Sequence, residues 1–219
     1  MLGSRMLHPE ALGRVTENGN RVGEFTVDGT IELVLFGGLG GGVAAAVIWV
    51  IVWQWVPRHP LAVGLGAVAI GGFNLIDAEN RDFVILVDPL ADVVLLVGLL
   101  FAFGASLVWI DRWFDTLLPD GTGVISIVVY SIIVSLGVPF LIPVIGGFFT
   151  TEFCFCANPP LATGGFVVIT ALATGWWWVM DLRGSASPPR MLTTVGATSV
   201  ALAIVAGTVH LVGEITTIL

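Results

Sequence analysis

Long apolar runs alternate with short polar segments along most of this chain. Six runs after residue 30 each have about the 17–25 residues that a helix needs to cross the hydrocarbon core of a bilayer. The second run is the shortest and fits a helix with little tilt or a locally thinned bilayer. The runs lie near residues 31–56, 61–76, 90–110, 124–149, 162–181 and 192–217. The pattern predicts an all-α polytopic membrane bundle of about six transmembrane helices.

The first 30 residues have a different, polar character. Asn18-Gly19 stands between short alternating runs, which is a signal for a β-hairpin. We therefore expect two parts in the chain. Residues 1–30 form a polar N-terminal arm with a possible hairpin, and residues 31–219 form the six-helix transmembrane domain.

Composition supports burial in a membrane. Hydrophobic residues make up 56% of the 219 residues and charged residues 11%, whereas soluble domains carry about 25% charged residues. A bilayer must therefore cover the apolar surface. The net charge of −8 argues against nucleic acid, which needs a cationic surface. The expected partners are the lipid bilayer and either other membrane protein chains or further copies of this chain.

The arginines indicate an orientation in the cell membrane. Alternating spans place the loops 57–60, 111–123 and 182–191 on one side. The positive-inside rule predicts that this side is cytoplasmic and that both chain termini lie outside. All eight tryptophans fall at the same side, at the ends of the first, third and fifth spans, which is typical of an interfacial aromatic belt. The arginines near this side are Arg58, Arg112, Arg183 and Arg190.

Acidic residues gather at the opposite side, and the stretch FNLIDAENRDFVILVDPLAD is the densest part. His210 and Glu214 are four residues apart, so they share one face of the sixth span. Small residues on that face predict close packing, so this pair is expected to point into the bundle. Together with Asp92 and Glu32, they are candidate ligands for a metal or another ion. Alternatively, Glu214 lies at the headgroups, and Asp92 and Glu32 stabilise helix N-termini.

Two prolines interrupt the fourth span. Pro139 and Pro143 each remove a backbone hydrogen bond and free the carbonyls of Ser135 and Pro139. Freed carbonyls beside hydroxyl groups can line an ion path, so Ser135 and Pro139 form a possible path. The alternative is a kink that fits neighbouring helices.

The first span contains GGLGGGVAAA, with two overlapping pairs of glycines four residues apart. Such pairs let helix backbones approach closely. No strand precedes the run and no Lys-Ser/Thr follows it, so it is not a nucleotide-binding loop. We expect helix packing here, within the chain or with a partner, at Gly37, Gly38, Gly41 and Gly42.

Both cysteines, Cys154 and Cys156, lie in the loop TTEFCFCANPP. They are either inert thiols or an oxidised or metal-binding pair. His210 is the one histidine within a predicted span, so this chain alone does not hold a bis-histidine haem. No motif specifies a cofactor.

Two runs of the sequence carry a resemblance. Val22, Gly23, Glu24, Phe25 and Thr26 precede the first span, and DAENRDFVIL follows the second. With these runs, residues 14–115 resemble a group of uncharacterised multi-spanning membrane proteins from high-GC bacteria. Members of that group have a further helix upstream. The resemblance implies no specific activity.

These observations leave three classes of function open. The first is a non-catalytic subunit or scaffold of a larger membrane complex, favoured by the glycine-rich first span and by the lack of a catalytic signature. The second is a small ion, proton or metal permease that uses the acidic side and His210. The third is a membrane metalloenzyme, with His210, Glu214 and Asp92 as ligands.

Overall fold

The computed structural model describes residues 12–15, 19, 21, 22, 24, 26–80, 89–117, 128, 140, 142–154, 156, 158–184 and 187–219. Within this part of the chain the fold is helical and contains no β-strand. Near the N-terminus, an isolated antiparallel bridge joins Val15 to Arg21. Gly19 lies between them with a φ of 77°, a left-handed conformation that favours glycine.

Three helices are long and apolar enough to cross a membrane. They are α6 (Pro89–Leu117), α9 (Leu161–Leu182) and α10 (Arg190–Ile218). The 29 residues of α6 or α10 extend about 43 Å, more than the roughly 30 Å of a bilayer core. The three helices correspond to the third, fifth and sixth predicted spans and are compatible with an integral membrane protein.

Six spans were predicted, and three helices of sufficient length are found among the described residues. The second predicted span is a helix of 12 residues, α4 (Pro60–Gly71), continued by one 3₁₀ turn, η3 (Gly72–Asn74). A helix of 12 residues is about 18 Å long, too short to cross the core by itself. Most of the fourth predicted span, 124–149, lies outside the described residues.

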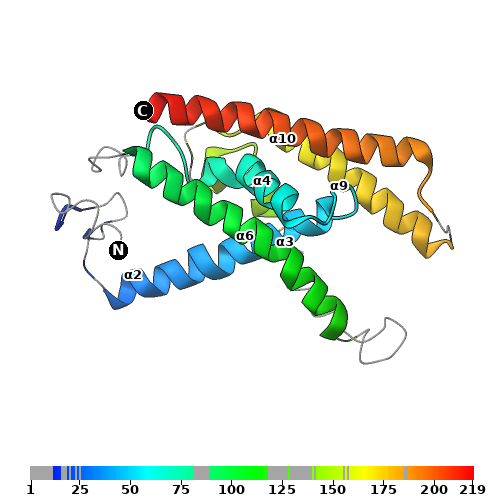
Figure 1. Ribbon diagram of the computed structural model, residues 1–219, viewed down its shortest axis with the longest axis horizontal. Helices are drawn as coiled ribbons and strands as arrows, with labels where there is room; N and C mark the ends of the chain where they lie inside the picture. The colour runs from blue at the N-terminus through cyan, green and yellow to red at the C-terminus, as the bar shows by residue number, and fades with distance from the viewer. Residues whose placement is uncertain are drawn as a thin grey trace.

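The first predicted span is a composite helical segment. It begins as α2 (Val27–Glu32), continues as a π-helical stretch, η2 (Leu33–Gly40), and ends as α3 (Gly41–Val52). In Figure 1 this segment runs at an angle to α10, and the α2 end lies away from the other labelled helices. A short helix, α8 (Thr151–Cys154), precedes α9.

Prolines and glycines define the helix ends. Pro60 opens α4, where its missing N–H costs nothing. Pro160 and Pro189 stand immediately before α9 and α10. After α9, Gly184 has a φ of 85°, and its N–H donates to the Asp181 carbonyl at 2.8 Å, which stops the helix.

Helix α4 lies at the centre of the packing. It contacts α6 on one side and α10 on the other, while α9 packs against both α10 and α3 (Figure 1). Glycines allow the close approaches: a Cβ at Gly104 of α6 would collide with Ala67, and one at Gly207 of α10 would collide with the Ala69 carbonyl. The α4–α6 and α4–α10 contacts therefore depend on isolated glycines.

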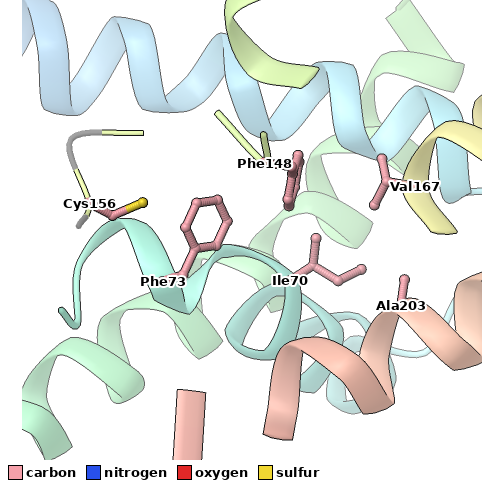
Figure 2. Packing of buried hydrophobic residues seen from close by; sticks show 6 residues of the cluster. All are labelled: Ile70, Phe73, Phe148, Cys156, Val167 and Ala203. Atoms are coloured by element: carbon pink, nitrogen blue, oxygen red, sulfur yellow. The ribbon is translucent and has the colours of Figure 1, made fainter. Parts of the chain in front are cut away.

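Three groups of buried side chains form the core. One lies where α4, η3, α9 and α10 meet, and Figure 2 shows six of its members. A second joins the end of α3 to α4, α6 and α10. The third, centred on Ile76, Val93 and Leu211, fastens the start of α6 to the last turns of α10.

Candidate functional site

Glu214 connects the last helix to the polar loop that follows η3. Its Oε2 atom accepts a hydrogen bond of 2.8 Å from the backbone N–H of Ala78. Its Oε1 atom lies 3.9 Å from Nε2 of His210, one turn earlier on α10. The exposed fractions of the side chains are 23% for His210 and 13% for Glu214. Both side chains therefore face protein and not the surrounding medium.

The loop itself is ordered around a second acid. Asp77 is buried, and its Oδ1 accepts a hydrogen bond from the Glu79 N–H at 3.0 Å. The Asn80 N–H donates to the Asp77 carbonyl at 3.1 Å. This is an Asx-type turn, in which the acid stabilises backbone geometry. The remainder of the acidic stretch, residues 81–88, lies outside the described residues.

The other predicted ion ligands are placed as follows. Asp92 lies in the first turn of α6, where the helix dipole stabilises a carboxylate. Its neighbour Val93 packs with Leu211, so Asp92 lies at the same end of the bundle as Glu214. Glu32 is the last residue of α2. Ser135 and Pro139 lie outside the described residues.

A metal centre gains no support from the part of the chain that the structure describes. No group of three or more His, Cys, Asp or Glu side chains there is arranged to hold a metal ion. Catalytic zinc needs three such protein ligands. The predicted metal or ion site stays a prediction; its ligands would be His210, Glu214, Asp92 and Glu32.

The cysteine loop contains a disulfide. Cys156 is disulfide-bonded, and Cys154 is the other cysteine of the chain. No described cysteine is free. Of the alternatives drawn from the sequence, the oxidised state therefore holds for Cys156, and its pairing with Cys154 stays a prediction. Cys156 is buried beside Phe73 and near Phe148 (Figure 2), so it belongs to the core and is shielded from solvent.

The close helix contacts among the described residues use other glycines than the predicted Gly37, Gly38, Gly41 and Gly42, whose packing with a partner stays a prediction. Among the described residues, no atom lies within 4 Å of a Cβ built at Gly41 or Gly42. Gly37 and Gly38 belong to η2, and Gly38 is exposed. Gly64 of α4, by contrast, lies so close to α6 that a Cβ would approach the Phe101 ring at 2.8 Å. Close packing between the described helices therefore does not use Gly41 and Gly42.

The sequence analysis did not predict the hydrogen bonds that two tryptophans make at the end of α3. Trp49 Nε1 donates to Asp111 Oδ1 at 3.1 Å. Trp55 Nε1 donates to Thr174 Oγ1 at 2.8 Å, and that hydroxyl donates to the Ile51 carbonyl at 2.7 Å. Trp49 and Trp55 are thus hydrogen-bonded inside the protein, and their role exceeds the predicted anchoring at an interface.

Comparisons with known proteins provide no relative. No family model, curated protein or solved structure matches the chain. The class that the fold supports is a helical protein with three apolar helices compatible with an integral membrane protein.

Proposed function

We propose that this chain is a non-catalytic subunit or scaffold of a larger membrane assembly, joined to its neighbours through the glycine-rich helical segment 27–52. The observation that carries the proposal is that no described residue fills the space at Gly41 and Gly42. Glycine in a helix interior costs about 0.5–1 kcal/mol relative to alanine. Close contact with another helix is a reason to accept that cost.

The surroundings of the segment support this role. Its apolar side chains are widely exposed, with exposed fractions of 76% at Val27, 60% at Val34 and 62% at Leu39. Among the described residues, α3 packs against α9 and its end joins the buried cluster with α4, α6 and α10, whereas α2 packs chiefly against η2. The outer half of the segment is therefore available to a neighbouring helix, from another membrane protein or from a second copy.

Native mass spectrometry of the protein, extracted in mild detergent, tests the proposal. The wild-type chain is expected to travel with partner chains, or with further copies, at a fixed stoichiometry. The double variant Gly41→Leu/Gly42→Leu should lose that association, because two large side chains would fill the contact. Gly98→Leu is the matched control, since Gly98 is a helical glycine of α6 that also meets nothing within 4 Å.

Two results would overturn the subunit proposal. One is a wild-type chain that is monomeric and without partners in every mild detergent. The other is an assembly that the double variant and Gly98→Leu weaken equally, because the effect would then reflect bulk on any exposed helix face.

A small ion, proton or metal permease is the second candidate, supported by the mostly buried ionisable pair His210 and Glu214 in an apolar helix. The hydrogen bond from the Ala78 N–H to Glu214 is a structural reason for an acid at this position. We therefore favour the subunit proposal over the permease. Purified protein in liposomes should pass a cation if the permease proposal is right. His210→Ala combined with Glu214→Gln should then abolish the flux, and its persistence would refute the path.

A further inference from the structure

The corner between α3 and α4 brings charged side chains to the end of α6. The guanidinium carbon of Arg58 lies 4.5 Å from the centre of the Trp53 ring. Arg58 Nη1 is 3.9 Å from Asp115 Oδ2, and Arg112 Nη2 donates to the Arg58 carbonyl at 3.1 Å. Two guanidinium groups and one carboxylate of α6 therefore share one small surface.

The charged groups of this corner have hydrogen-bonding atoms that a ligand could reach. The 3.9 Å between Arg58 and Asp115 is too long for a hydrogen bond, and their side chains are 41% and 67% exposed. On the segments that form the corner, Gln54 Nε2 and Asp111 Oδ2 are buried without a hydrogen-bond partner among the described residues. Buried polar atoms usually have a partner. The corner therefore offers both donors and acceptors to a bound group.

The apolar stretch of α6 that leads to this end is little covered by the rest of the described chain. Only 17% of the most apolar window of α6 is buried within the chain. Trp109 and Trp113, exposed to 70% and 50%, stack with ring centres 6.3 Å apart. Exposed tryptophans at a helix end sit at the level of the headgroups. Arg58, Arg112 and Asp115 are thus at the depth at which phospholipid headgroups lie.

We propose that this corner binds the zwitterionic headgroup of an amino phospholipid, with Arg58 and Arg112 holding the phosphate and Asp115 the ammonium group. The charges decide between lipid classes. Arg58 and Arg112 are balanced by Asp111 and Asp115, so an anionic headgroup gains no net attraction. A phosphate joined to a primary ammonium matches both signs, and the ammonium donates the hydrogen bonds that a carboxylate accepts. A choline group has no N–H to donate.

The test is native mass spectrometry of the full chain in mild detergent with equal amounts of phosphatidylethanolamine, phosphatidylcholine and phosphatidylglycerol. We expect phosphatidylethanolamine to be retained about tenfold more than either competitor, the effect of one or two charge-assisted hydrogen bonds. Arg58→Gln and Arg112→Gln should each weaken retention of all three lipids. Asp115→Asn should remove the preference for ethanolamine over choline but keep the lipid. Arg190→Gln, an exposed arginine at the start of α10, should change nothing.

The ranking of the three lipids on the wild-type chain decides the question even if a variant fails to fold. Stronger retention of phosphatidylglycerol would overturn the proposal, since it would mark an anionic-lipid site. Equal retention of the three lipids would do so too, because it indicates only unspecific lipid around the helices. A loss with Arg190→Gln as large as that with Arg58→Gln would also contradict it.

Discussion

The carboxylate of Glu214 accepts a hydrogen bond of 2.8 Å from the backbone N–H of Ala78, which lies 136 residues earlier in the chain. This bond fastens the loop after η3 to the last turns of α10, and Ile76 and Leu211 of the same two segments pack in one buried cluster. The acidic stretch that stood out in the sequence is therefore part of the tertiary structure at its described end, as well as part of a polar surface.

Replacement of Glu214 by leucine should destabilise the protein by about 1–3 kcal/mol, because the part-buried Ala78 N–H would lose its acceptor. Glu214→Gln keeps an oxygen acceptor at the same position and should cost clearly less. Thermal unfolding in detergent compares the two variants. Equal loss in both would show that the charge of Glu214, and not the hydrogen bond, matters.

Thr174→Val should cost about 1–3 kcal/mol, since the Trp55 indole and the Ile51 carbonyl would both lose a buried partner. The matched control is Thr170→Val. Thr170 is equally buried, but its hydroxyl bonds only to the Phe166 carbonyl of its own helix, so this change should cost less than about 1 kcal/mol. Chemical unfolding followed by tryptophan fluorescence provides the measurement. Similar losses in the two variants would argue against the Trp55 contact.

Gly207→Ala should be strongly destabilising, because the added methyl group would collide with the Ala69 backbone of α4. Overpacking of this kind costs about 1–3 kcal/mol. Gly213→Ala, six residues later on the same helix, meets nothing within 4 Å and should be neutral or stabilising by up to about 1 kcal/mol. Thermal unfolding of both proteins is the test. A neutral Gly207→Ala would mean that α10 and α4 are farther apart than described.

The disulfide predicts the chemical state of the purified protein. Without reductant, a thiol reagent added to the denatured chain should label neither cysteine, since Cys156 is bonded and the chain has one other cysteine. After reduction both should be labelled. Mass spectrometry counts the labels, and full labelling before reduction would contradict the disulfide.

Hydropathy predicted the membrane class and the three long helices because an apolar run of at least 18 residues depends on composition alone. The second span shows the limit of that reasoning. The run 61–76 is apolar except for Asn74, but its helix gives way to a 3₁₀ turn at Gly72. The hydropathy of a run of residues does not show where an α-helix within that run ends.

Contacts between distant residues were harder to predict. Glycine density pointed to Gly41 and Gly42, whereas the helices of this chain meet at isolated glycines such as Gly64 and Gly207. The Trp49–Asp111 bond joins residues 62 positions apart, a separation at which local periodicity has no information. The i, i+4 spacing of His210 and Glu214, in contrast, lies within one helix and was visible in the sequence.

Membrane topology is the claim on which the lipid proposal rests: the loop around Glu79 and the connection before α10 should lie on opposite sides of the bilayer. We propose to place single cysteines at the exposed positions Glu79 and Ser187, in a chain with Cys154→Ser and Cys156→Ser. A membrane-impermeant thiol reagent added to intact cells should label the Glu79→Cys protein and should label the Ser187→Cys protein only after the membrane is opened. Labelling of both from the same side would contradict the topology and, with it, the separation of the acidic end from the arginine and tryptophan end.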